Sequence, residues 1–321
     1  MVTRASSWET HPVGGWPVRV LSCRQNGHET TVRFVPSMGC NVIGFQVDGQ
    51  EYLAACEPDG RILGTPVLYP TPNRVRNATF TFDDQVYRFE PNDGPHFIHG
   101  LVRHVAWELD APQETTDGLA ISANVRVAPG TDAWDVFPIR NTLSLRLEVT
   151  PGRLQMTFDI NNDDPDQRLP FGLAIHPYFR ILGERGDVTI HIPARRWMEA
   201  EALLPTGRLL PPSACSADPT EPITLENLDL DDVFWGMRAS QPATVVYGAL
   251  GTRITLEADD WFTHAVVYTP PDRPYLCVEN QSCSTDAHNL AAKGFERAAH
   301  LTVLEPGASH QATVAMQVGN P

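Results

Sequence analysis

The stretch 143–160, LSLRLEVTPGRLQMTFDI, decides the fold class. Apolar residues occupy alternate positions from Leu143 to Val149, and again from Leu154 to Ile160. Alternation with a period of two places the apolar side chains on one face of a β-strand. The Pro151-Gly152 pair between the two halves is typical of a turn, so the stretch predicts a β-hairpin.

The same alternation recurs along most of the chain. Further alternating segments are 80–82 with 86–89 around an Asp83-Asp84 turn, 121–127, 188–192, 254–256, 265–267, 301–303 and 313–318. Helical periodicity is poor, and its best candidate, 288–299, is interrupted by Gly294. No GxGxxG or GxxxxGK(S/T) motif follows a strand, so a nucleotide-binding α/β fold has no support. The proline-rich stretch 205–222 is interpreted as a long surface loop. These patterns predict a single all-β domain over residues 1–321, either a sandwich or a barrel, with few short helices.

The net charge and the hydropathy of the chain limit which classes of partner and which location we expect. The 321 residues include 24 Lys and Arg against 39 Asp and Glu, a net charge of −15. This excess of acid argues against nucleic acid and anionic membranes as partners. Residues 1–16 lack the apolar core of a signal peptide, and no stretch approaches the length of a membrane span. The cytoplasm is therefore the expected location.

The cysteines predict neither a disulfide framework nor a metal site. They lie far apart without a CxxC pair, in a chain too long to need disulfides for its stability. We interpret them as reduced and mostly buried thiols. They are Cys23, Cys40, Cys56, Cys215, Cys277 and Cys283.

Ionisable residues stand among Gly, Pro and aromatic residues in the segments 72–76, 92–100, 172–179 and 276–290. Glu279 follows an apolar run that predicts a buried strand, where desolvation would raise its pKa towards the range of a useful base. The alternative is a glutamate at a strand end that pairs with an arginine. His176 is a candidate acid or, alternatively, a hydrogen-bonded core histidine. His96 and His99 form an HxxH pair without a nearby third ligand, so no metal is expected.

Taken together, these segments resemble the aldose 1-epimerase (galactose mutarotase) family, in a bacterial branch. The resemblance runs from about Asn73 to Asn289. The motifs that carry it are Asn73-Arg74 before Phe80 to Phe82, Asn92 with His99-Gly100, His176-Pro177-Tyr178-Phe179, Asp231 before Phe234, and Glu279 and Gln281 before Asp286-Ala287-His288-Asn289.

This resemblance implies a large antiparallel β-sandwich with an open cleft along one face. Glu279 matches the general base that takes the proton of the anomeric hydroxyl, and His176 matches the general acid that protonates the ring oxygen. His99 matches a second catalytic histidine. The substrate-binding residues that we predict are Arg74, Asp231, Asn92, His96, Tyr178 and Gln281, with Asp232 as an alternative to Asp231. Ring opening removes a proton from the anomeric hydroxyl and adds a proton to the ring oxygen. It therefore needs a base and an acid but no cofactor.

An aromatic floor would suit a sugar ligand. Its candidates are Phe97, Tyr178, Trp235 and Trp261, although each could equally be a core residue. The expected partner is a free monosaccharide such as galactose or glucose, bound by a monomer or a homodimer.

Two other functions fit the same residues. The first is a mutarotase for a phosphorylated or sulfonated hexose, which would need a local basic patch in this acidic chain. Its candidate residues are Arg74, Arg76, Arg103 and Arg180, and it predicts that three of them converge at one end of the cleft. The second is a non-catalytic carbohydrate-binding or sensing protein, which would need the sugar ligands but not the acid-base residues.

Overall fold

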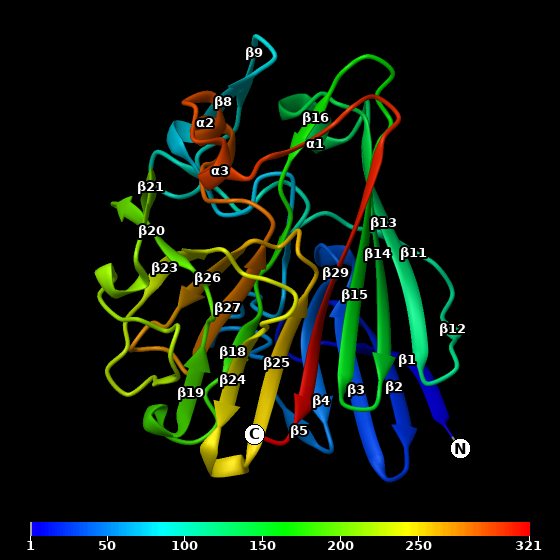
Figure 1. The fold of residues 1–321 in the computed structure, drawn as a ribbon. Coiled ribbons are helices and arrows are strands. Elements are labelled where there is room, and N and C mark those ends of the chain that lie inside the picture. The colour runs from blue at the N-terminus through cyan, green and yellow to red at the C-terminus, as the bar shows by residue number, and fades with distance from the viewer. Residues whose placement is uncertain (1) are drawn as a thin grey trace.

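The hairpin predicted from residues 143–160 lies within a ten-stranded antiparallel sheet. The computed structural model describes residues 2–321. In it β14 (Asn141–Thr150) pairs with β15 (Arg153–Asn162), with Leu147 opposite Met156. The sheet runs in the order β11-β13-β14-β15-β29-β25-β24-β19-β22, and β12 also pairs with β13. Figure 1 shows β29, the last strand of the chain, between β15 and β25. The remaining strands are β11 (Glu108–Leu109), β12 (Gln113–Glu114), β13 (Leu119–Val127), β19 (Val188–His191), β22 (Ile223–Thr224), β24 (Ala243–Tyr247), β25 (Thr252–Ala258) and β29 (Ser309–Gly319).

A second, eight-stranded sheet carries the candidate site. Its order is β21-β20-β23-β26-β27-β17-β6, and β18 pairs with β27 beside β17. All of its pairings are antiparallel. Its strands are β6 (Val67–Leu68), β17 (Ala174–Ile175), β18 (Tyr178–Arg180), β20 (Arg196–Glu201), β21 (Leu204–Leu210), β23 (Asp231–Trp235), β26 (His264–Tyr268) and β27 (Tyr275–Gln281).

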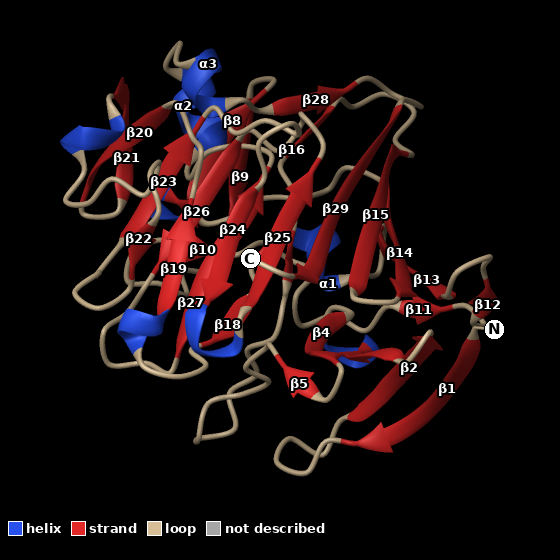
Figure 2. Cartoon of the chain, turned by 60° about the horizontal axis from the view of Figure 1, so that its bottom comes forward, coloured by secondary structure: helices blue, strands red, loops and turns tan. Residues whose placement is uncertain are grey.

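A five-stranded sheet in the order β1-β2-β3-β4-β5 forms the N-terminal part of the described chain. Figure 2 shows its strands as a curved group beside the larger sheets. Its strands are β1 (Thr3–Thr10), β2 (Pro17–Gln25), β3 (His28–Val35), β4 (Asn41–Val47) and β5 (Gln50–Glu51). Three two-stranded sheets pair β7 (Arg74–Val75) with β10 (Phe97–Ile98), β8 (Thr79–Phe82) with β9 (Gln85–Arg88), and β16 (Leu169–Phe171) with β28 (Thr302–Leu304).

Helices are few and short, as predicted. They are α1 (Asp132–Val136), α2 (Ala287–Ala292) and α3 (Glu296–Ala299), with 3-10 turns at Pro36–Met38, Arg76–Ala78, Arg185–Asp187, Pro212–Ala214 and Gly248–Leu250. The candidate helix 288–299 is confirmed as α2 and α3, which are separated by a break that contains Gly294 at φ +85°. No helix within residues 2–321 is long and apolar enough to cross a membrane.

One hydrophobic core joins the three large sheets. It contains Phe158 from the ten-stranded sheet, Phe234 from the eight-stranded sheet and Phe45 from the N-terminal sheet, each with no exposed surface. The alternation of apolar residues explains this core, because β14 and β15 bury every second residue over their whole length. The structure confirms an all-β fold made of antiparallel sheets.

One predicted loop is wrong in part. The stretch 205–222 was expected to be a surface loop, but its first residues belong to β21, which pairs with β20. Because β21 is an edge strand, Pro205 can sit in it without removing a hydrogen bond from the sheet. Beyond Leu210 the stretch is irregular apart from the 3-10 turn Pro212–Ala214. The six cysteines are free and four of them are buried, as expected.

Candidate active site

A cleft of about 330 Å³ lies against the outer face of the eight-stranded sheet. Its floor comes from β26, β27 and β18, and one wall comes from the segments around Asn73 and His99. The strand period decides which residues of β27 reach it. Leu276 and Val278 belong to the core, so Tyr275 and Glu279 project from the opposite face into the cleft.

Glu279 is the buried carboxylate of this floor. Its side chain is only 2% exposed, and its Oε2 accepts a hydrogen bond of 2.9 Å from Nε2 of Gln281. Burial raises the pKa of Glu279 well above its usual value, and the hydrogen bond from Gln281 offsets part of this rise. The carboxyl group therefore holds a proton more readily than a glutamate exposed to solvent does.

His176 faces Glu279 directly. Its Nε2 lies 3.2 Å from Oε1 of Glu279, and its ring stacks on Tyr178 at a centroid distance of 4.5 Å. Burial lowers the pKa of His176 to about 3. Its Nδ1 is buried and has no hydrogen-bond partner within residues 2–321. Two side chains that lie 103 positions apart in the sequence thus form one acid-base pair.

The pair can exist in two forms that differ only in which of the two groups holds one shared, exchangeable proton. In one form Glu279 is a carboxylate and His176 an imidazolium; in the other both groups are neutral. Burial opposes charge on either group, so it favours the neutral form. A ligand that contacts both groups from the cleft could give a proton to one and receive a proton from the other.

His99 lies beside His176, at a centroid distance of 5.2 Å and nearly perpendicular to it. The loop that presents His99 is tight: His99 has φ +72° and its N–H donates to the carbonyl of Asn73 at 3.0 Å. Burial lowers the pKa of His99, and the neighbouring His176 lowers it further. His99 is therefore a neutral imidazole in the cleft.

Arg74 and Asp231 stand on the other side of the cleft. Nε of Arg74 donates to Oδ2 of Asp93 at 2.7 Å. Burial raises the pKa of Asp231, and the charge of Arg74 offsets part of the rise. Asp232 points away from the cleft and accepts a hydrogen bond from Nε1 of Trp197 at 2.8 Å. Between the two aspartates, Asp231 is the one that lines the cleft.

Three predicted substrate ligands do not line the cleft. Asn92 instead closes its own loop, because its side chain accepts from the N–H of Ile98 and donates to the carbonyl of Ile98. Nδ1 of His96 accepts from the N–H of Asn77 on the surface. Gln281 is fully buried and contacts Glu279 rather than the open cleft.

The aromatic floor also differs from the prediction. Of its four candidates only Tyr178 lines the cleft, together with Tyr268 and Tyr275, which the sequence did not single out. Phe97 stacks on Phe89 in the core, and Trp261 packs on Phe171. Trp235 lies beneath the guanidinium of Arg297.

The alternative of a phosphorylated or sulfonated hexose predicted that three of Arg74, Arg76, Arg103 and Arg180 converge at one end of the cleft, and the lining of the cleft does not show this. Only Arg74 lines the cleft, where it pairs with Asp93. Arg76 pairs with Asp286, and Arg180 is exposed outside the cleft. Arg61, Asn73 and Asp93 line the cleft and were not in the predicted set.

Among residues 2–321 no group of three or more His, Cys, Asp or Glu side chains could hold a metal ion.

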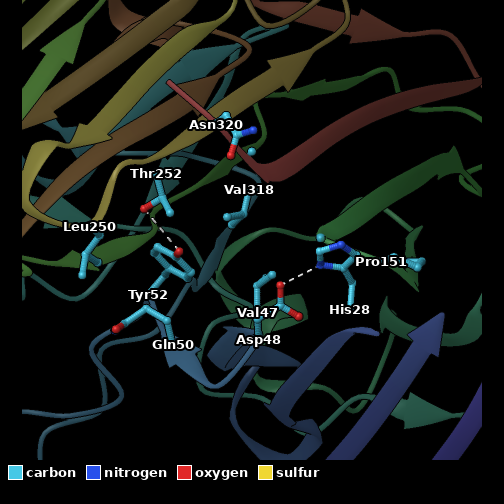
Figure 3. Close-up of a pocket in the computed structure, with 12 residues that line it drawn as sticks. His28, Val47, Asp48, Gln50, Tyr52, Pro151, Leu250, Thr252, Val318 and Asn320 are labelled. Atoms are coloured by element: carbon cyan, nitrogen blue, oxygen red, sulfur yellow. Dashed lines mark hydrogen bonds and ion pairs between the residues drawn. The ribbon is translucent and has the colours of Figure 1, made fainter. Parts of the chain in front are cut away.

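A larger hollow lies elsewhere in the described chain. It measures about 470 Å³, between the β4–β5 turn and the ends of β25 and β29 (Figure 3). It contains an exposed pair of His28 and Asp48 at 2.9 Å, and a weak contact of 3.4 Å between the hydroxyl groups of Tyr52 and Thr252. Its lining residues include no buried acid-base pair, so the smaller cleft is the better candidate for chemistry.

The sequence profile and two of the curated relatives that match this chain are named as epimerases or mutarotases. A sequence profile described as "Aldose 1-epimerase" matches residues 23–317. Galactose mutarotase of Sus scrofa is 28% identical over 190 residues, which cover 57% of this chain and 51% of that protein. Maltose epimerase of Levilactobacillus brevis is 26% identical over 187 residues, 54% of this chain and 48% of that protein. The chain thus spans about half the length of these curated relatives.

Solved structures share the fold over the whole chain. A galactose mutarotase-like protein from Clostridium acetobutylicum has a TM-score of 0.85 at 18% identity, and covers 100% of this chain and 99% of its own. A galactose 1-epimerase from Lactobacillus acidophilus has a TM-score of 0.77 at 16% identity, with coverage of 100% and 99%.

Proposed function

The chain belongs to the aldose 1-epimerase family, and from this premise we propose that it interconverts the α and β anomers of an aldose without a cofactor. The observation that supports this best is the buried pair of Glu279 and His176, 3.2 Å apart at the floor of an open cleft. Hydrogen-bonding groups for sugar hydroxyls stand beside the pair on Arg74 and Asp231. Galactose and glucose are the first substrates to test.

The proposed reaction starts from the charged form of the pair. The Glu279 carboxylate takes the proton of the anomeric hydroxyl, the electron pair left on that oxygen forms the aldehyde carbonyl, and the bond from the anomeric carbon to the ring oxygen breaks. The imidazolium of His176 gives its proton to the ring oxygen. The pair is then neutral, and the sugar is an open-chain aldehyde.

Rotation about the bond between the first two carbons presents the other face of the aldehyde. The same hydroxyl then attacks that face, His176 takes its proton back, and Glu279 returns its proton to the new anomeric hydroxyl. No net proton is gained or lost. We assign His99 to the ring-oxygen side, where a neutral imidazole can donate a hydrogen bond without competing for the proton.

We also propose that residues 1–321 act as one domain, because one core is shared by the three large sheets. Met1 lies outside the described residues. Both halves of the chain contribute to the cleft, since His99 comes from the first half of the sequence and Glu279 from the second.

The test is the rate of anomer exchange. Polarimetry on freshly dissolved α-galactose and α-glucose should show acceleration by the wild-type protein. The Glu279→Gln variant should lower the rate at least about 100-fold, the usual effect of removing an acid-base group, while sugar binding is largely kept. The exposed Glu226→Gln serves as the matched control and should keep the wild-type rate.

Two results would contradict the proposal. A wild-type rate in Glu279→Gln would exclude Glu279 as the base. Sugar binding by calorimetry, with no acceleration of exchange by the wild-type protein, would identify a carbohydrate-binding protein instead of an enzyme.

A further inference from the structure

Asp93 lines the cleft beside the hydroxyl-binding residues, although the sequence motifs did not predict it there. It lies in the loop that leads into β10. Two backbone hydrogen bonds of 3.0 Å close this loop into a tight turn, one from the N–H of Asp93 to the carbonyl of His96 and one in the reverse direction. The side chain of Asn92 closes the loop again, because it bonds both backbone groups of Ile98. The backbone that presents Asp93 to the cleft is therefore held on both sides.

The carboxylate of Asp93 orients the guanidinium group of Arg74. In the pairing of β7 with β10, Arg74 lies opposite Ile98, so the two segments run side by side. Oδ2 of Asp93 accepts a hydrogen bond of 2.7 Å from Nε of Arg74. The Arg74 side chain is only 14% exposed, and its Nη1 has one long contact of 3.4 Å with Oδ1 of Asn73. The bond at Nε fixes the plane of the guanidinium group and leaves Nη2 without a partner within residues 2–321.

The second carboxylate oxygen of Asp93 is an unused acceptor at the cleft. Within residues 2–321, Oδ2 alone of the two oxygens accepts a hydrogen bond, and the side chain keeps 38% of its surface exposed. A carboxylate oxygen can accept two hydrogen bonds, and those that it accepts are stronger than bonds between neutral groups. Oδ1 of Asp93 and Nη2 of Arg74 therefore offer an acceptor and a donor on one wall of the cleft.

A sugar hydroxyl matches this donor and acceptor. Because a hydroxyl both donates and accepts, it can donate to Asp93 and accept from Arg74 at the same time. A sugar that lacks the hydroxyl would leave both groups unpaired in the complex, which is the arrangement that gives strong discrimination against a deoxy analogue. In the proposed reaction Glu279 and His176 act on the anomeric hydroxyl and the ring oxygen. The hydroxyl at Asp93 is therefore one that does not react.

We propose that Asp93 is a further substrate-binding residue that determines specificity: its Oδ2 orients Arg74, and its Oδ1 accepts a hydrogen bond from one non-reacting hydroxyl of the sugar. The preferred substrate then has an unsubstituted hydroxyl at the position that Asp93 contacts. This inference rests on the proposed epimerase function. Asp231 is a separate ligand, because it comes from β23 and forms no hydrogen bond with Asp93 within residues 2–321.

Two variants separate the two roles of Asp93. Asp93→Asn keeps an oxygen that can accept from Arg74 but replaces the second oxygen with an N–H donor, whereas Asp93→Ala removes both contacts. The matched control is Glu90→Gln, which removes the same charge from an exposed side chain three residues earlier, outside the cleft. Thermal unfolding establishes that each variant is folded.

Saturation-transfer NMR measures anomer exchange for glucose and for its 2-, 3-, 4- and 6-deoxy analogues. KM for glucose should rise about tenfold in Asp93→Asn while kcat changes less than about threefold, because the lost contact is made equally before and during ring opening. Asp93→Ala should raise KM further, because Arg74 then loses its orientation as well. The Glu90→Gln protein should keep the wild-type values.

The decisive quantity is the ratio of kcat/KM for glucose to kcat/KM for each deoxy sugar. For one of the four deoxy sugars this ratio should be about tenfold lower in Asp93→Asn than in Glu90→Gln, because the variant no longer recognises the hydroxyl that this sugar lacks. For the other three it should agree within about twofold. The sugar whose ratio falls identifies the hydroxyl that Asp93 contacts.

A binding measurement gives a readout that is independent of turnover. The compound 1,5-anhydroglucitol is glucose without its anomeric hydroxyl, so its ring cannot open. Calorimetry should show that it binds the Asp93→Asn protein about tenfold more weakly than the Glu90→Gln protein.

The assignment is overturned if all four ratios are the same in Asp93→Asn and Glu90→Gln, as a purely structural role of Asp93 would produce. Equal affinities of these two variants for 1,5-anhydroglucitol overturn it as well. A failure of the epimerase function is distinct from both results, because then the wild-type protein accelerates exchange for none of the five sugars, while the binding measurement still tests Asp93.

Discussion

At the scale of single residues, the shared proton of Glu279 and His176 determines how the rate should depend on pH. The pair works only while it contains one proton. Adding a second proton requires protonation of His176, whose pKa burial lowers to about 3. Removing the last proton requires ionisation of Glu279, whose pKa burial raises. The lowered pKa and the raised pKa are properties of the coupled pair, not of either residue alone. They set the acid and alkaline limits of the pH range in which the rate is constant.

We therefore predict a broad plateau in kcat/KM. The rate should change by less than about twofold between roughly pH 5 and 6.5, fall below about pH 4, and fall again at higher pH once Glu279 ionises in the free protein. Saturation-transfer NMR over this range, corrected for the uncatalysed reaction, is the measurement. An acid limb centred near 6.5, the ordinary pKa of histidine, would contradict the lowered pKa of His176.

The sequence was most informative for residues whose neighbours form a motif. Glu279, His176, His99, Arg74 and Asp231 were all predicted to be together, and all line the cleft. His96 was predicted with them because it precedes His99 by only three residues. The positive φ of His99 turns the loop, so the His96 ring bonds to Asn77 on the surface instead. The spacing of two residues in the sequence does not reveal such a change in backbone direction.

Arg61 and Tyr275 show what motif reasoning could not find. Arg61 lies in a polar loop with no neighbouring pattern, and Tyr275 looked like the start of a buried strand. Their positions depend on Glu57, which pairs with Arg61 and accepts a hydrogen bond from Tyr275, 218 positions further along the chain. Such a contact is set by tertiary packing, and only the fold reveals it.

At the scale of elements, the loop from Asn92 to Gly100 positions His99 through a close backbone contact. Gly100 has φ +67°, and a Cβ atom there would lie 2.3 Å from the carbonyl oxygen of Tyr69. Neither atom can move without moving backbone. The loop therefore holds His99 against His176 by a contact that only glycine permits.

Gly100→Ala should lower both stability and activity. The left-handed conformation alone costs about 1–2 kcal/mol for alanine, and the backbone clash adds to this. Urea unfolding measures the free energy, and anomer exchange measures the displacement of His99. The matched control is Gly94→Ala in the same loop, with φ +57° and nothing within 4 Å of the added Cβ. Equal losses of activity in the two variants would show that the contact with Tyr69 has no role in positioning His99.

Individual strands were predicted well, but their partners were not. The hairpins β8–β9 and β14–β15 follow from alternation around a short turn, which is local information. The pairing of β15 with β29 joins residues more than 140 positions apart, and nothing in either strand specifies it. The prolines led us to predict a loop where β21 lies. Pro205 is tolerated there because β21 is an edge strand, which the sequence alone does not reveal.

At the scale of the whole molecule, the protein is held together by packing without disulfides. Four of the six free thiols are buried in the structure, and only Cys56 and Cys215 are partly accessible. Burial raises the pKa of the Cys40, Cys277 and Cys283 thiols, which makes the reactive thiolate rare.

We predict that a thiol reagent labels at most two cysteines rapidly in the folded protein and all six in denaturant. Mass spectrometry counts the labels. Reductant should leave the thermal midpoint unchanged, because the described chain contains no disulfide to break. A lower midpoint in reductant would reveal a disulfide and contradict the free-thiol assignment.

The position of β29 has a consequence for biosynthesis. All other strands of the ten-stranded sheet are translated before β29, yet β29 joins β15 on one side to β25 on the other. While a ribosome is still making residues 309–319, the sheet can form only as two separate halves, each with an unpaired strand edge at β15 or β25. Such edges are the features that chaperones and aggregation partners recognise. The largest sheet is therefore complete only when β29 has emerged from the ribosome, and removal of residues 309–319 would leave two unjoined half-sheets rather than a slightly smaller protein.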